Sequence, residues 1–541
     1  MTSASKSSKR VLAVVAGSAA FALALTGCQA GTDSAGGGSD SLTVGTTDKV
    51  TFLDPAGSYD NGSFALMNQV FPFLLNSPLG TSDVEPDIAV SAEYTSDDQY
   101  TVVLKDGLKF ANGNDLTSSD VKFSFDRQVA IADENGPSVL LGNIDSVDAV
   151  DDTTVVFNLK NGNDQTFAQI LSSPAAPIVD EEVFSADAVT PDADIVAGNA
   201  FAGQYVIDSY DFNNVVSFKA NADYQGVLGA AATDTILLKY YTDASNLKLD
   251  VQEGNIDVAH RSLSATDVAD LEGNDKVNVV VGPGGEIRYI VFNFDTQPFG
   301  AKTPEADAAK SLAVRGAVAD LINRQEISDQ VYKGTYLPLY SYVPDGLTGA
   351  TEVLKDLYGD GEGGPSSEAA QKRLSDAGVA TPVKLNLQYN PDHYGESSGD
   401  EYALVKSQLE ADGIFEVNLQ STEWVTYAKE RTADAYPAYQ LGWFPDYSDA
   451  DNYLTPFFGD GNFLGNHYAD AEVNDLIVAQ ATELDPAKRE GMIQDIQAKV
   501  AAQLSTVPFL QGAQIAVTGK DVTGATLDGS FKFRYGSLAK N

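Results

Sequence analysis

Segments with strand and helix patterns alternate along most of this 541-residue chain, and this alternation limits the fold more than any other feature. It favours sheets flanked by helices, the α/β architecture whose ligands bind in crevices. The length indicates two or three domains. The expected strands, which are β-branched or aromatic runs between turn residues, are Leu42–Thr46, Tyr100–Leu104, Thr154–Leu159, Val215–Lys219 and Thr235–Tyr240. The expected helices, which have helical apolar periodicity, are Ser118–Val129, Ala308–Leu321, Glu368–Ala377, Tyr402–Ala411 and Pro486–Leu504.

The N-terminus has the pattern of a lipoprotein signal peptide. Basic residues precede an apolar run from Val11 to Leu25, and the tetrad Leu25-Thr-Gly-Cys28 follows. The run is shorter than the ~20 residues of a membrane-spanning helix. We therefore expect residues 1–27 to be removed and Cys28 to be acylated, with a second chain on its freed amine. The alternative is an ordinary secreted protein with a chance cysteine.

The segment 28–41, rich in glycine and small polar residues, predicts a flexible tether. Because Cys28 is the only cysteine, the folded part has no disulfides and must be stabilised by its core. The chain has 34 basic and 77 acidic residues, a net charge of −43. This charge disfavours nucleic acid and anionic lipid as partners. Solubility explains the acidic excess, and selection for cationic ligands is the alternative.

The most specific segment runs from Tyr100 to Val121 and has the pattern strand, turn, strand, turn, capped helix. Its Asp-Gly and Asn-Gly dipeptides tolerate positive φ. Thr117, followed three residues later by Asp120, predicts a helix N-cap with an acidic partner. The whole segment closely resembles the signature of the family 5 solute-binding proteins of ABC importers, the oligopeptide, dipeptide and nickel group.

The resemblance continues in order along the chain. The matching segments are Leu53–Ala56, Asn221–Gly226, Glu253–Val258, Phe292–Asn293, Val314–Ala317, Asn323–Arg324, Leu374–Gly378, Glu423–Trp424 and Gly442–Asp449. The last segment departs from the family pattern at Pro445, where a small residue is common, and is followed by Ala450 where proline is usual. These departures leave the conformation of the loop open.

The resemblance implies an α/β, two-lobed periplasmic-binding-protein-like fold of type II with an extra subdomain. Lobe I would comprise residues 42–77, 203–289 and 508–541, and the extra subdomain would comprise 78–202. Lobe II would span 290–507. Crossovers near Ile290 and Val507 would form the hinge.

The resemblance also implies a ligand site between the lobes. In the peptide-binding members of the family, the ligand pairs with the protein backbone like an added strand. Its α-ammonium needs a fixed anion, since an unpaired buried charge is costly. Asp446 lies at the position that the resemblance assigns to that anion; the other predicted ligand-binding residues are Gly442, Trp443, Phe444, Tyr447, Trp424, Asp60 and Asn61. The alternative makes Asp446 a turn residue and the aromatic residues part of the core.

The sequence offers little support for an enzyme. The histidines at 260, 393 and 467 are isolated, without metal-ligand spacing, and no nucleophile elbow or Walker lysine occurs. We therefore expect no catalytic residues, no metal and no cofactor. A Ser-His-Asp triad or a carboxylate pair has no fixed spacing, so a secreted hydrolase is the alternative from another class.

We therefore expect a monomeric, lipid-anchored protein at the extracytoplasmic face of the cell membrane. It would capture short peptides and deliver them to the permease and ATPase subunits of an ABC importer. A nickel chelate, haem or an oligosaccharide is the alternative solute.

Overall fold

The computed structural model of the protein describes residues 41–541, apart from residues 262, 392 and 396, within one unit that spans residues 38–541. The predicted signal peptide, the predicted acylation site Cys28 and almost all of the predicted tether lie outside the described residues. Among residues 41–541, leaving out those three positions, no helix has both the length and the apolar content that a membrane span requires.

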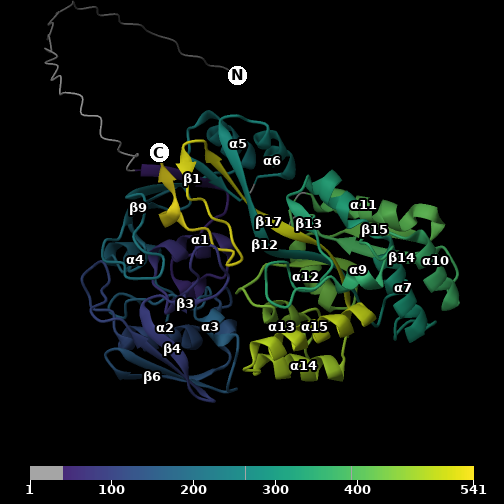
Figure 1. The fold of residues 1–541 in the computed structure, drawn as a ribbon, viewed down its shortest axis with the longest axis horizontal. Coiled ribbons are helices and arrows are strands. Elements are labelled where there is room, and N and C mark those ends of the chain that lie inside the picture. Colours follow the sequence, from purple (N-terminus) through teal and green to yellow (C-terminus); the bar gives the residue numbers. More distant parts are fainter. Residues whose placement is uncertain (1–40, 262, 392, 396) are drawn as a thin grey trace, which may run out of the picture. The chain divides into compact units, whose positions relative to one another are not determined.

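Most strands belong to one mixed sheet, with the order β15-β14-β16-β12-β17-β11-β1-β10-β9-β8 and β13 beside β17. Two long strands, β12 (Val277–Phe292) and β17 (Thr506–Gly519), pair antiparallel near its middle (Figure 1). They join its two halves. The other strands are β1 (Ser41–Thr46), β8 (Tyr205–Asp211), β9 (Val215–Ala220), β10 (Thr235–Tyr240), β11 (Val258–His260), β13 (Tyr336–Pro338), β14 (Val383–Tyr389), β15 (Phe415–Ser421) and β16 (Ala438–Trp443).

The first half of the sheet is built around β1, which pairs in parallel with β10 and β11. Alternate residues such as Leu42 and Val44 are buried in a core shared with Phe218 and Ile236, as expected for a strand with one buried face. Asp60 begins α1 as its N-cap. The helices of this region are α1 (Asn61–Val70), α4 (Asp192–Gly198), α5 (Ala244–Glu253) and α6 (Ala265–Glu272).

A separate antiparallel sheet has the order β4-β5-β7-β6 and its own apolar core. Helix α2 packs against it and begins with the predicted capping box. The Thr117 Oγ1 accepts a hydrogen bond from the Ser119 N–H at 3.2 Å, and the Thr117 N–H donates to Asp120 Oδ2 at 2.9 Å. The elements are β4 (Ala89–Ser96), β5 (Gln99–Leu104), α2 (Ser118–Ile131), β6 (Ile144–Asp151), β7 (Thr154–Leu159) and α3 (Phe167–Ile170), with the short pair β2 (Leu75–Asn76) and β3 (Glu85–Pro86) nearby in sequence.

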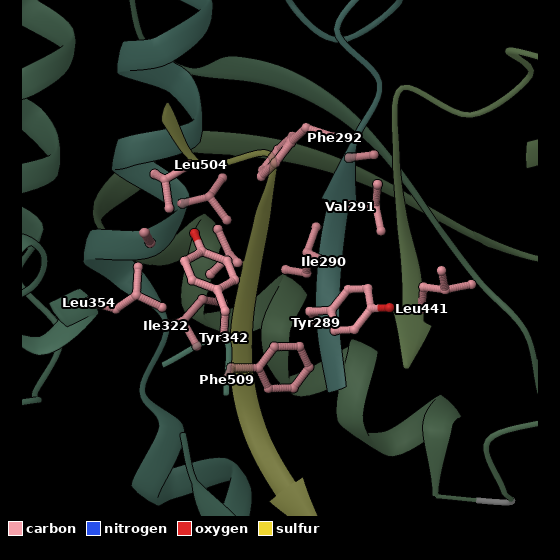
Figure 2. Close-up of a cluster of buried hydrophobic side chains, with 14 of the residues drawn as sticks. Tyr289, Ile290, Val291, Phe292, Ile322, Tyr342, Leu354, Leu441, Leu504 and Phe509 are labelled. Carbon is pink, nitrogen blue, oxygen red and sulfur yellow. The ribbon is translucent and has the colours of Figure 1, made fainter. Parts of the chain in front are cut away.

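The second half of the large sheet contains the largest apolar core. Figure 2 shows part of it, where Ile290 of β12 and Phe509 of β17 lie near Tyr342 and Leu441. The helices of this region are α7 (Ala308–Leu321), α8 (Arg324–Ile327), α9 (Val353–Leu357), α10 (Ser367–Asp376), α11 (Ser398–Glu410), α12 (Trp424–Thr432), α13 (Asp451–Phe458), α14 (Ala471–Ala481) and α15 (Pro486–Gln503); the strands β18 (Val522–Thr523) and β19 (Ala539–Lys540) follow β17.

Each strand and helix segment predicted from the sequence matches an element of the predicted type, with ends that differ by a few residues. The domain boundaries stay a prediction. The two predicted crossover residues, Ile290 and Val507, are direct partners in the ladder between β12 and β17.

Candidate functional site

A cavity of about 270 Å³ lies where chain segments that are distant in the sequence meet. Its wall includes the start of α1, the loop between β16 and α13, parts of β12 and β17, and a segment near the C-terminus. The main contributing ranges are 61–68, 260–261, 284–286, 444–448, 512–515 and 530–533.

Two glycines of β12 allow the walls to approach closely. A Cβ atom on Gly284 would lie 1.8 Å from the Gly512 carbonyl oxygen, and a Cβ atom on Gly285 would lie 2.4 Å from Pro445 Cγ. The β12–β17 register shifts at this point. Any larger residue here would force β12 away from β17 or from the loop that carries Asp446.

Asp446 lies in the cavity wall with neutral hydrogen-bond partners. The Tyr59 hydroxyl donates to Oδ1, and Asn452 Nδ2 donates to Oδ2 at 3.1 Å. Burial raises the pKa of Asp446, while these two hydrogen bonds oppose that rise. No ion pair involving Asp446 occurs among the described residues. Its carboxylate therefore faces the cavity without a cationic protein partner.

Three other predicted site residues, Phe444, Tyr447 and Asn61, also line the cavity. The Tyr447 hydroxyl donates a hydrogen bond to Asp451 Oδ2 at 3.3 Å, and its ring packs against the core of the small sheet. Phe444 packs against the core of the second half of the large sheet. The loop after β16 thus contacts two different cores from within four residues.

The remaining predicted site residues are not among the described residues that line the cavity. Asp60 accepts hydrogen bonds from the backbone and side chain of Ser63, both at 2.8 Å, and so caps α1. Trp424 stacks on His393 at a centroid distance of 3.8 Å. Gly442 is a ladder residue in β16.

Trp443 is placed behind the loop, where its Nε1 donates to Asn452 Oδ1 at 2.9 Å. The same oxygen accepts from the Asp446 N–H at 2.9 Å. Trp443 therefore positions Asn452, which in turn holds both the backbone and the carboxylate of Asp446.

The wall also contains a buried cation that was not predicted from the sequence, Lys532, which is 9% exposed. Its Nζ donates to the Ser172 carbonyl at 2.7 Å and lies 5.7 Å from the Phe73 ring centroid. Burial lowers the pKa of Lys532 well below its usual value. The alternation of aromatic and basic residues in Phe531–Arg534 was the sequence signal that could have identified it.

Two further cavity residues, His260 and Arg261, were also missed. The His260 ring stacks on Phe533 at a centroid distance of 4.1 Å, and burial lowers its pKa to about 3. His260 is therefore neutral at physiological pH. Arg261 Nε lies 3.2 Å from Asp48 Oδ2, so the charge of Arg261 is already paired.

A second carboxylate, Glu286 of β12, is tied to a network behind the cavity. Arg288 Nε lies 3.3 Å from Glu286 Oε1, and Arg288 Nη1 lies 2.9 Å from Glu401 Oε2. The Tyr336 hydroxyl donates to Glu286 Oε2. This network joins β12, α11 and β13 beside the cavity.

One group away from this cavity has atoms placed as metal ligands would be. Asp295, Asp434 and His467 offer ligand atoms within 4.8 Å of one another. Lys302 Nζ lies 2.7 Å from Asp295 Oδ2 and so already neutralises part of this charge. His467 is isolated in the sequence, because its two carboxylate neighbours in space, Asp295 and Asp434, lie far away along the chain.

Comparisons with known proteins identify similar chains. The profile of the family described as "Bacterial extracellular solute-binding proteins, family 5 Middle" matches residues 83–465. The heme-binding protein A of Haemophilus influenzae is 24% identical over 492 residues, covering 85% of each chain. A dipeptide-binding protein of Pseudomonas aeruginosa is 26% identical over 503 residues, covering 86% of this chain and 87% of the relative.

A solved structure, that of HbpA2 from Haemophilus parasuis, has a similar fold. It superimposes with a TM-score of 0.78 at 22% identity, and the match covers 93% of this chain and 100% of the other. At this identity the likeness concerns the fold.

Proposed function

Because this chain belongs to family 5 of the bacterial extracellular solute-binding proteins, we propose that it captures short peptides in the cavity beside Asp446 and delivers them to an ABC importer. Membership confirms the prediction of a two-lobed, α/β periplasmic-binding-protein-like fold, which the likeness to HbpA2 also supports. It also confirms that the chain is a binding protein and not an enzyme.

The observation that supports a peptide best is the environment of Asp446. Its carboxylate lines the cavity and has neutral donors from Tyr59 and Asn452. A peptide's α-ammonium would supply the missing positive charge and relieve the cost of the buried anion. The proposal assigns Phe444, Tyr447 and Asn61 to the surrounding wall. Trp443 would keep the loop in position.

The size of the cavity favours a small solute. Its volume of about 270 Å³ lies just below the roughly 300–1,000 Å³ of pockets that hold drug-sized ligands. A peptide of two or three residues suits this volume better than haem. The Haemophilus influenzae relative named for heme nevertheless makes haem the solute to test against peptides.

The membrane attachment is the second part of the proposal. An acyl chain on Cys28, with another on its amine, would anchor the mature protein at the extracytoplasmic face of the membrane. The segment 28–41 would keep the binding unit close to the permease. The tetrad Leu25-Thr-Gly-Cys28 supports this step.

Mass spectrometry of the solute released from protein purified without denaturation tests the function. We expect short peptides, and adding a peptide mixture should raise the melting temperature of the stripped protein. Release of haem, a metal chelate or a sugar, with no response to peptides, would refute the peptide assignment.

A further inference from the structure

Among the charged groups of the cavity wall that the structure describes, only Lys532 and Asp446 form no ion pair. An ammonium has three N–H donors, and here one of them reaches the Ser172 carbonyl at 2.7 Å. The centroids of the Phe64 and Phe73 rings lie 6.0 and 5.7 Å from Nζ. Two donors are thus left without an acceptor among the described residues.

Two carboxylates, Asp528 and Asp87, attract the Lys532 charge, but neither forms an ion pair with it. Asp528 accepts hydrogen bonds from the N–H groups of Gly80 at 2.7 Å and Ser530 at 2.9 Å. Asp87 accepts at Oδ1 from the Tyr224 hydroxyl and from the backbone N–H of residue 227, while its Oδ2 has no hydrogen-bond partner among the described residues. Arg534 adds a further positive charge nearby. No described carboxylate thus lies within ion-pair distance of the Lys532 ammonium.

We propose that Lys532 binds a carboxylate of the captured solute, so that the cavity selects solutes carrying both an ammonium and a carboxylate. This inference rests on the proposed function and extends it to the second charged end of the peptide. Lys532 and Asp446 come from different segments of the same wall, one after β17 and one after β16. A carboxylate at Lys532 would fill its free donors and form a charge-assisted hydrogen bond.

The test compares three libraries in binding to the mature protein: unmodified dipeptides, the same dipeptides amidated at the C-terminus, and amidated dipeptides that contain aspartate or glutamate. Native protein should prefer the first library to plain amides by about 10- to 100-fold. Lys532→Met keeps the length and apolar contacts of the side chain, and it should reduce this preference to near unity. The third library distinguishes a side-chain carboxylate from the C-terminal one as the group that Lys532 binds.

Arg261→Gln is the matched control, because it also removes a cavity cation but one already paired with Asp48. Arg261→Gln should leave the preference for unmodified over amidated dipeptides unchanged, and Lys532→Arg should retain part of this preference. Without ligand, the melting temperature of Lys532→Met should be no lower than that of native protein, because the substitution removes a buried charge that has no ion-pair partner.

The possible failures are distinct. If native protein binds none of the libraries, the proposed function fails. The inference fails and the proposed function stands if native protein binds dipeptides and Lys532→Met still prefers unmodified dipeptides to amidated ones. The same conclusion follows if Lys532→Met loses equal affinity for unmodified and amidated dipeptides and also melts at a lower temperature.

Discussion

Replacing Asp446 by asparagine removes one charge from the cavity and keeps the shape of the side chain. Asp446 is held by the Tyr59 hydroxyl and by Asn452. The hydroxyl can donate to or accept from an asparagine, and the amide can rotate to suit Asn452. The backbone hydrogen bond from residue 446 to Asn452 Oδ1 at 2.9 Å does not involve the altered group. We therefore expect the loop to keep its conformation.

The expected magnitude follows from the surroundings of the carboxylate. Breaking a buried ion pair from one side costs about 3–5 kcal/mol. Asp446 is partly buried, so the lower end applies, and about 3 kcal/mol corresponds to a loss of roughly two orders of magnitude in affinity. Isothermal titration with a free-amine dipeptide measures this loss.

An N-acetylated dipeptide isolates the charge pair from damage to the loop. It should bind native protein weakly, and Asp446→Asn should reduce its affinity far less than that of the free-amine dipeptide. The two peptides and the two proteins together form a double-mutant cycle. Asp60→Asn is the matched control, because asparagine also caps helices and residue 60 does not line the cavity. Equal losses for both peptides with Asp446→Asn, or no loss for either, would refute the role of this carboxylate.

Three further predictions concern pH, anchoring and stability. Burial raises the pKa of Asp446, so peptide affinity should fall as the pH drops through that raised value. Tyr59→Phe removes a hydrogen bond that lowers this pKa, so in a binding–pH profile of the variant the loss of affinity should occur at higher pH. Cys28→Ala should yield soluble protein or an unprocessed precursor in cell fractionation, and a mature membrane-bound form would contradict the anchor. The Arg127–Asp54 pair is 1% and 0% exposed, so Arg127→Met should cost about 3–5 kcal/mol in denaturant unfolding, and an unchanged midpoint would contradict this.

Local signals made most of the fold predictable from the sequence. The Thr117–Asp120 pair predicted the start of α2, and the structure confirms that cap. Asp307 and Asp485 likewise cap α7 and α15, so helix starts were encoded within a few residues of sequence. Each of these interactions needs no knowledge of distant segments, which explains why element types were predicted well.

The site was predictable only in part, because its geometry depends on long-range contacts. Tyr59 and Asp446 are 387 residues apart, and Lys532 and Ser172 are 360 residues apart. A sequence pattern does not indicate such pairs. Asp60 illustrates the opposite problem: the spacing to Ser63 suits a helix cap, and this local role is the one that the structure shows.

The cavity wall contains two buried charged groups of opposite sign, Asp446 and Lys532. Burial raises the pKa of Asp446 and lowers that of Lys532, because in each case burial disfavours the charged form. A solute with both an ammonium and a carboxylate would relieve both costs, whereas a solute with one of them would leave the other group buried and unpaired. A ligand that lacks one charged end leaves a buried group unpaired, and this costs more binding free energy than one additional contact contributes. Under the proposed function, a cavity built in this way would select free dipeptides by their two ends and would make few demands on their side chains.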